Sequence, residues 1–522
     1  MHAYKENTMI VARFRGRARR TAAAGLLALA LVCAHANAAD AGGAAALHDN
    51  FFWLGQFNKA SLVMTVEQGI VPRDLGQKTA RAVAQVIAEG DKPGGKRPGD
   101  YLQLEPLITR IAGPDATRMH SGRSRQDILA ATRRVMLRDR LLDLYAALNQ
   151  AHATVNALAE KYADAIVPAY TNGVQAQPTT YGHYLLAFSS VLDRDAARLR
   201  ETYGRVNLSP LGAAALGTSS FPVDRKRLAD LLGFDGVVEN AYDAAQFSPL
   251  DVGAEAASLA STMALSVGAF VQDIHTQYQQ TKPWLTLQEG ALTGTSSIMP
   301  QKRNPSALND LRLQASQTVG EAMTALVAAH NVPPGMPDYK REQAQDAVDA
   351  ATEMYRKLDA VLSGLSLDRD RALAEVDADY STSTELADVL QRDADVPFRV
   401  GHHFASELVN FGRKNNLKPA DIPYPDAQRI YTQAAKASNI NDAKLPLDEA
   451  RFRQVLTAQN MIASSKGLGG PQPAEVARML AGAREKLAGD QAWLQSARDR
   501  LNAAQDNLDR AFDNIANPPP KK

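Results

Sequence analysis

The stretch GTSSIMPQKRNPSALNDL, residues 294–311, joins a short polar loop to the start of a helix. Two adjacent serines open the loop, and Lys302 and Asn304 follow just before Pro305. A lysine beside an asparagine can hold a carboxylate by charge-assisted hydrogen bonds, and the first backbone amides of a helix favour an anion. The same pattern also fits a capped helix start with a solvated lysine, and spacing alone does not separate these two interpretations.

Helical periodicity lies on both sides of this loop. Apolar residues recur every three or four positions before it, at Leu259, Met263, Val267, Phe270 and Ile274, and after it, at Leu308, Leu311, Ala315, Val319, Ala322 and Leu326. Near the C-terminus the interval is seven, at Leu480, Leu487, Leu494, Leu501, Leu508 and Ile515. These stripes predict buried helix faces and an all-α protein. We expect the heptad face to pack within the chain, with packing between subunits as the alternative.

The N-terminus has the pattern of a secretory signal peptide. Five arginines between residues 13 and 20 precede an apolar run that ends in small residues at Ala38. The run is too short to span a bilayer comfortably. Residues 1–38 therefore predict a periplasmic or secreted protein, cleaved near Ala38, and the arginine pair leaves either general or twin-arginine export open.

Composition limits the classes of partner. Residues 1–38 hold six basic and one acidic residue, so their removal lowers the formal net charge from +1 to −4. This balance gives no reason to expect nucleic acid or a membrane as partner after signal removal. The one cysteine, Cys33, lies in the predicted signal, and the mature chain offers no HExxH-type spacing and no Gly-rich phosphate loop. We expect no metal and no cofactor.

Two further polar stretches could bind a small anion. MHSGRSRQD, residues 119–127, alternates Arg123 and Arg125 with serines, and arginine forks at this density suit a carboxylate. One of the two arginines, with Arg123 as the candidate, is expected to tie helix ends together. AYTNGVQAQPTTYGHY, residues 169–184, is rich in neutral hydrogen-bonding groups, and a turn with satisfied polar side chains explains it adequately.

Together these stretches resemble the fumarase/aspartase superfamily, most closely its argininosuccinate lyase branch. SSIMPQKRN, residues 296–304, is similar to the superfamily's serine loop, SSxMPxKxN, and HSGRSRQD, residues 120–127, is similar to the branch's HTGRSRND. RVNLSPLGAAAL, FPVDR and LGFDGVVEN, between residues 205 and 240, also resemble the branch, as do STSTELADVL and VPFRVGHH nearer the C-terminus. The resemblance covers nearly the whole mature chain.

The resemblance implies an all-α, three-domain fold. After the signal peptide, residues 39–125 would form a small N-terminal helical domain, residues 126–380 a long central bundle that carries the serine loop at 294–305, and residues 381–522 a C-terminal helical domain. In this superfamily the bundles of a homotetramer form a twenty-helix core. Each active site draws on three subunits, and the enzymes use no metal or organic cofactor.

Residue by residue, Ser296 matches the superfamily's catalytic base, while Lys302 and Asn304 match the groups that hold the carboxylate taking up negative charge. The remaining matches are substrate contacts: Ser124, Arg125, Gln126, Thr171, Asn172, Gln343 and, by a weaker alignment that includes Ser61, Asn58. The reaction implied is a reversible elimination, in which fumarate leaves an N-substituted aspartate as the bond to nitrogen breaks. Fumarate plus an amine is the reverse substrate pair.

Departures from the branch's pattern concern the leaving group. Where the branch has YTHLQ this chain has Asn172 in place of histidine, Gln126 replaces an asparagine, and Asp338 and Asp346 replace a tyrosine and a lysine. An amide cannot transfer a proton as imidazole does. We expect argininosuccinate, cleaved to arginine and fumarate as in arginine biosynthesis, or a related N-succinyl amine. The alternatives are another amine or polyamine, or a non-catalytic binding protein. His120 and His183 are the candidates for an acid that replaces the missing histidine.

Overall fold

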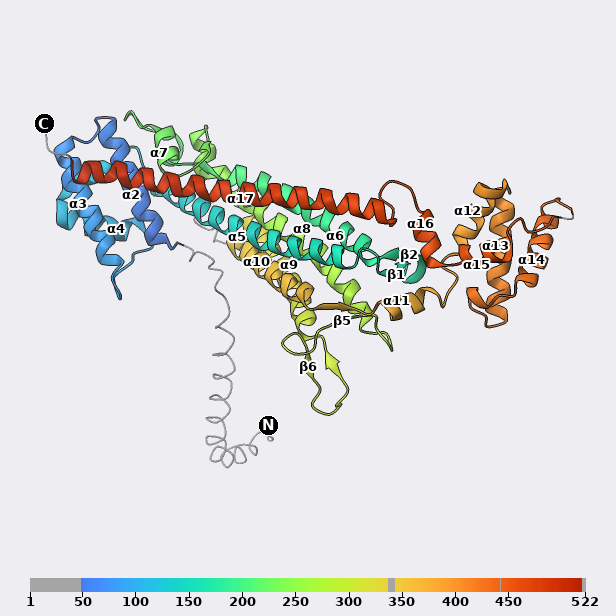
Figure 1. The fold of residues 1–522 in the computed structure, drawn as a ribbon. Helices are drawn as coiled ribbons and strands as arrows, with labels where there is room; N and C mark the ends of the chain where they lie inside the picture. The colour runs from blue at the N-terminus through green and yellow to red at the C-terminus, as the bar shows by residue number, and fades with distance from the viewer. Residues whose placement is uncertain (1–47, 337–342, 442, 519–522) are drawn as a thin grey trace, which may run out of the picture. The chain divides into compact units, whose positions relative to one another are not determined.

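The computed structural model describes residues 48–336, 343–441 and 443–518 of the chain (Figure 1). The predicted signal peptide and Asp338 lie outside the described residues. Most of the described chain is helical, so the all-α prediction is confirmed. The predicted boundaries at residues 125 and 380 stay predictions.

Five helices form a central bundle and pack against one another. They are α5 (Arg125–Lys161), α6 (Tyr181–Val206), α8 (Ser248–Gln277), α9 (Ser306–Ala329) and α10 (Gln343–Ser363). The apolar stripe from Leu259 to Ile274 is buried on α8, and Leu308, Leu311, Ala315 and Ala322 are buried on α9. The helix from Asp243 to Gln277 is long and apolar enough to cross a membrane by length and composition. However, half of its most apolar 18-residue stretch is buried inside the protein. Its apolar character serves the core.

A second hydrophobic cluster, called the N-terminal cluster below, gathers shorter helices around the start of α5. These are α2 (Asn50–Glu67), α3 (Arg73–Gly90), α4 (Tyr101–Ala112), a 3₁₀ helix (Pro114–His120) and α7 (Arg225–Leu231). Arg138 of α5 is fully buried there, donates to Oδ1 of Asn207 at 3.1 Å, and lies over the rings of Trp53 and Phe234. Aromatic faces and carbonyl oxygens thus replace the hydration of its guanidinium.

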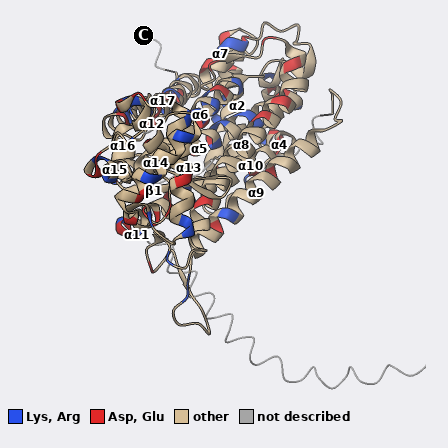
Figure 2. Cartoon of the chain, turned by 90° about the vertical axis from the view of Figure 1, so that its right-hand side faces the viewer, with Lys and Arg blue, Asp and Glu red and all other residues tan. Residues whose placement is uncertain are grey.

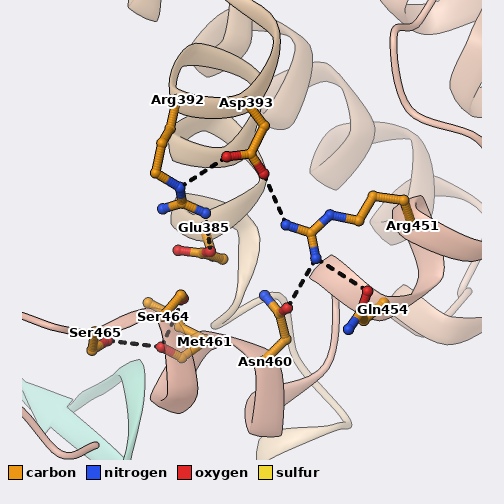
Figure 3. Close-up of polar contacts among 9 residues, drawn as sticks. All are labelled: Glu385, Arg392, Asp393, Arg451, Gln454, Asn460, Met461, Ser464 and Ser465. Carbon is orange, nitrogen blue, oxygen red and sulfur yellow. Dashed lines mark hydrogen bonds and ion pairs between the residues drawn. The ribbon is translucent and has the colours of Figure 1, made fainter.

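The C-terminal part is a set of short helices with its own cluster of buried apolar residues. The cluster takes residues from α12 (Ser383–Ala394), α13 (Phe398–Lys414), α14 (Tyr424–Ala437) and α15 (Glu449–Val455). The neighbouring helices α11 (Arg369–Val376) and α16 (Ala458–Ser464) instead contact residues 166–171 and 174–180. Figure 3 shows that Asp393 on α12 bridges Arg392 and Arg451, at 3.1 and 2.9 Å. Arg451 also donates to Oδ1 of Asn460 at 3.3 Å, so it links α12, α15 and α16.

The last helix, α17 (Pro473–Ala516), packs along α5 and α6 and reaches α2 and α3. Leu480, Leu487, Leu494 and Leu508 of its heptad face are all buried against the same chain. Packing within the chain is therefore confirmed for this face. Because α17 supplies buried residues to both the bundle and the N-terminal cluster, it ties the two together.

Short two-stranded ladders interrupt the helices. They are β1 (Ile166–Thr171) with β2 (Val174–Thr180), β3 (Leu208–Ser209) with β4 (Gly236–Val237), β5 (Leu285–Leu287) with β8 (Leu365–Leu367), and β6 (Gly294–Thr295) with β7 (Arg303–Asn304). The β1–β2 hairpin stands where the sequence predicted only a turn between helices. Positions of basic and acidic residues alternate along the described helices (Figure 2).

Candidate active site

The serine loop, residues 294–305, is a hairpin closed by the β6–β7 ladder. Gly294 pairs with Asn304, and α9 begins at Ser306 with Pro305 as its cap, which confirms the predicted helix start. The hydroxyl of Ser296 accepts hydrogen bonds from the backbone amides of Ile298, at 3.4 Å, and Met299, at 3.1 Å. The ladder thereby holds Ser296 and Asn304 on one loop at one end of the bundle.

Lys302 is exposed on the same loop, whereas its neighbour Arg303 is bonded to Glu289 at 3.1 Å and to the carbonyl of Pro300 at 2.7 Å. Two N–H donors directed at the Ser296 oxygen favour its negatively charged form. The loop therefore presents a serine oxygen, a cationic side chain and an amide to a ligand from outside.

Ser124 and Arg125 lie at the start of α5, and both make contacts within the chain. The Ser124 hydroxyl accepts from the amide of Gln126 at 3.2 Å, and Asp127 accepts from the amide of Ser124 at 2.6 Å, which together form a capping box. Arg125 is exposed and pairs with Asp100 at 2.9 Å. Gln126 lies half-buried in the first turn.

Arg123 is the arginine that ties helices together, as the sequence predicts. Its guanidinium is buried and donates to Oδ1 of Asn58 at 3.0 Å, to Oγ of Ser61 at 2.9 Å, and to Nδ1 of His120 at 3.0 Å. Asn58 lies on α2 and is almost fully buried. In this arrangement Asn58 and Ser61 position Arg123 and, through it, the turn that carries Ser124.

Thr171 and Asn172 lie at the tip of the β1–β2 hairpin. Thr171 pairs with Val174, so Asn172 and Gly173 form the two-residue turn, with φ of 54° and 75°. Positive φ at both positions is the requirement of a type I′ turn, and Asn-Gly is the dipeptide that meets it best. That dipeptide between β-prone residues is the local sequence signal for this hairpin. Both Thr171 and Asn172 are exposed.

The predicted site residues fall into two groups at opposite ends of the bundle. Ser124 caps the first residue of α5, and β1 follows its last residue, so 37 residues of helix separate them. At 1.5 Å per residue this is roughly 55 Å. The serine loop, which immediately precedes α9, lies at the hairpin's end of the bundle.

Gln343 belongs to the group that lies at the start of α5, with Ser124 and Arg125. It begins α10 and lines a cavity of about 70 Å³ with Ala329 at the end of α9 and Ala130 on α5. Because α9 has 24 residues, roughly 36 Å separate this position from the serine loop. A single described chain therefore does not bring Ser296 together with Ser124, Arg125 or Gln343.

Neither histidine considered as a replacement acid has a free ring. His120 stacks on Tyr101 with 4.5 Å between ring centroids, and its burial lowers its pKa to about 3, with the charge of Arg123 acting in the same direction. His183 is held at both nitrogens, by the Thr179 hydroxyl at 2.9 Å and the carbonyl oxygen of Gly469 at 2.8 Å. Both rings serve packing and loop attachment.

Comparison with known proteins identifies relatives over most of the chain. A model of a family described as lyase matches residues 22–320, and one described as argininosuccinate lyase C-terminal matches residues 380–463. An argininosuccinate lyase of Methanothrix thermoacetophila is 31% identical over 453 residues, which is 84% of this chain and 87% of that protein.

Two solved structures have similar folds. An EDDS lyase variant with bound fumarate is 30% identical, with a TM-score of 0.80 over 90% of this chain and 92% of that one. A class II fumarase from Schistosoma mansoni is 16% identical, with a TM-score of 0.62 over 80% of this chain and 91% of that one, which shows the fold alone.

Proposed function

The chain belongs to the fumarase/aspartase superfamily, close to the argininosuccinate lyases, and from this premise we propose that it eliminates fumarate from an N-substituted aspartate. The observation that carries the proposal is the serine loop. Its Ser296 hydroxyl accepts hydrogen bonds from two backbone amides, and Lys302 and Asn304 lie on the same short loop.

In the proposed reaction, Oγ of Ser296 takes the proton from the carbon beside a carboxylate of the substrate. The electron pair left on carbon forms the double bond of fumarate, and the bond to nitrogen breaks so that the amine leaves with a proton. Lys302 and Asn304 hold the carboxylate on which negative charge develops, which stabilises the transition state more than the substrate.

The proton for the leaving nitrogen comes from a group other than His120 or His183. The environment of His120 keeps it neutral at physiological pH, and both nitrogens of His183 are engaged in hydrogen bonds. Asn172 forms an exposed turn and has no proton to give at neutral pH. We assign this role to water or to an acid from a second copy of the chain. A substrate whose nitrogen is already protonated needs no such acid, because breaking the bond to carbon then releases a neutral amine.

The leaving group is the finer part of the proposal. We favour argininosuccinate itself or a related N-succinyl amine. Another amine or polyamine is the alternative, because Gln126, Asn172 and Asp346 alter positions that match substrate contacts. Asp346 is exposed in the first turn of α10 and adds a negative charge there. Incubation with fumarate and a panel of amines, amino acids and polyamines, followed by mass spectrometry of the adducts, identifies the amine.

The proposed active site is assembled between chains in a homotetramer. Residues from the two ends of a bundle meet only if a second copy runs in the opposite direction, because roughly 55 Å separates them within one chain. The exposed faces of α8 and α9 carry large apolar side chains that suit such an interface: Leu265, Leu313, Met323 and Val327. Analytical ultracentrifugation of the purified protein measures the oligomeric state directly.

The proposed chemistry is tested by paired serine substitutions. We expect Ser296→Ala to reduce fumarate release, followed by ultraviolet absorbance with the identified substrate, by at least about a thousandfold. The matched control is Ser297→Ala, which removes the neighbouring hydroxyl and should retain most activity. Undiminished turnover in Ser296→Ala contradicts the assignment of the base, and a complete absence of turnover in the unmodified protein across the panel favours a non-catalytic binding protein.

A further inference from the structure

A cavity of about 140 Å³ lies beneath the β1–β2 hairpin, separate from the serine loop. Its walls come from both strands, the start of α6, the last turns of α8 and the segment that enters β5. A single water needs only about 10–15 Å³ of such space, so the cavity has room for a small organic molecule. None of the described residues of the serine loop lines it.

Aromatic rings form much of the wall. Tyr181 and Tyr184 lie nearly parallel, with 5.6 Å between ring centroids, and Trp284 meets Tyr181 edge-on at 6.0 Å. Tyr170 of β1 also lines the cavity. The faces of tyrosine and tryptophan rings carry partial negative charge and attract organic cations.

The residues that line the cavity carry negative charge and no positive charge. Asp273 on α8 is its carboxylate, and the lining residues include no lysine, arginine or histidine. The Tyr184 hydroxyl donates a hydrogen bond to Oδ2 of Asp273, which fixes the carboxylate beside the aromatic wall. Burial raises the pKa of both Tyr181 and Tyr184, so these phenols stay neutral and add no charge to the lining.

Three buried polar atoms of the lining have no hydrogen-bond partner within the described ranges 48–336, 343–441 and 443–518. They are the hydroxyl oxygen of Tyr181, which is 1% exposed, Oε1 of Gln277, which is 5% exposed, and the donor Nε1 of Trp284, which is also 5% exposed. A buried polar atom left unpaired is costly, so such atoms in native proteins are nearly always bonded to something. Both of these oxygens can accept an N–H hydrogen bond, and an ammonium group has three to give.

We propose that this tyrosine-lined cavity binds a small primary organic ammonium ion. The ammonium group bonds to Asp273, Gln277 and the Tyr181 hydroxyl, and the alkyl chain lies against the rings of Tyr184 and Trp284. Tyr170 directly precedes Thr171, so an occupant also braces the hairpin tip. The proposal stands on the described cavity alone and does not depend on the lyase reaction.

Titration calorimetry of the purified full-length protein with propylammonium chloride tests the proposal. We expect saturable binding, with no binding of propionate and much weaker binding of propan-1-ol, which have similar chains but lack the positive charge. Asp273→Asn keeps the shape of the side chain and should weaken binding at least about tenfold. The matched control is Asp251→Asn, an exposed carboxylate in the first turn of the same helix, which should bind as the unmodified protein does.

Equal binding of propan-1-ol, or unchanged affinity in Asp273→Asn, overturns the proposal. If Asp273→Asn fails to fold, as judged by circular dichroism, crystals of the unmodified protein soaked in propylammonium chloride decide the matter. Electron density for the amine between Tyr181 and Asp273 supports the site, and water alone at that position refutes it. Because these readouts measure binding, loss of fumarate release in a serine-loop variant neither supports nor weakens them.

Discussion

The guanidinium of Arg123 donates a 3.0 Å hydrogen bond to Oδ1 of Asn58, and this contact ties the turn before α5 to the middle of α2. Two positions later, Arg125 is exposed on the other side of the cap residue Ser124. Two arginines in one short motif thus have different partners and different degrees of burial. This difference separates an effect on stability from an effect on ligand binding.

We expect Arg123→Ala to lower the free energy of unfolding by roughly 2–3 kcal/mol, because it leaves the buried oxygen of Asn58 and the hydroxyl of Ser61 without their donor. Arg125→Ala should change that free energy by no more than about 0.5 kcal/mol and should instead remove most of the fumarate release, because Arg125 matches a substrate contact. Urea unfolding followed by circular dichroism measures the first effect. Equal destabilisation by the two substitutions would contradict the distinction.

Two inactive variants should restore activity to each other when they assemble together. Ser296→Ala and Arg125→Ala remove groups from opposite ends of the bundle, so mixed oligomers contain some sites that lack neither group. Dissociation of the two purified variants in mild denaturant, mixing and reassembly should recover a measurable part of the unmodified rate. Ser296→Ala mixed with Lys302→Ala is the control, because both changes lie on one loop and in the same sites. No recovery in the first mixture would place the site within one chain.

The turn formed by Asn172 and Gly173 should tolerate glycine and resist branched side chains. Asn172 has a φ of 54°, a conformation that costs a β-branched residue about 1–2 kcal/mol and costs glycine nothing. We expect Asn172→Val to speed hydrogen exchange at the amides of β1 and β2, while Asn172→Gly leaves it unchanged. Identical exchange in the two variants would show that the turn does not depend on this residue.

Asn172→His tests the origin of the leaving-group chemistry. A large gain in argininosuccinate cleavage would show that the position still faces a site built for histidine. Loss of activity on the identified substrate, without any gain on argininosuccinate, would show that the site is adapted to an amide. We expect the second outcome, because the exposed turn tip holds no described partner for an imidazole.

Acid should destabilise the protein partly through His120. Its pKa is lowered to about 3 in the folded chain by burial and by Arg123, so the unfolded chain binds a proton more readily between pH 3 and about 6.5. The stability it contributes is present above pH 6.5 and is lost as the pH falls through that window. We expect His120→Gln to lose less stability than the unmodified protein between pH 7.5 and pH 5 in urea unfolding. His402→Gln, at an exposed position on α13, is the control and should follow the unmodified protein.

Local sequence determined the features that depend on neighbours along the chain. Proline at residue 305 ends the loop and starts α9, and the intervals of three, four and seven placed the buried faces of α8, α9 and α17, because helix periodicity follows from backbone geometry. The serine loop was recognisable for the same reason, since its residues are contiguous. The β1–β2 hairpin was missed, although Asn172-Gly173 is a local signal for it.

Tertiary structure alone decided which distant residues meet. The partnership of Arg123 with Asn58, the separation of Ser296 from Ser124 by the length of the bundle, and the cavity between Tyr181 and Asp273 all depend on how helices pack. Such contacts join residues tens to hundreds of positions apart, and no spacing in the sequence encodes their distance. Packing placed Asn58, a predicted ligand contact, against Arg123, and it made the polar segment at residues 169–184 part of the wall of a cavity.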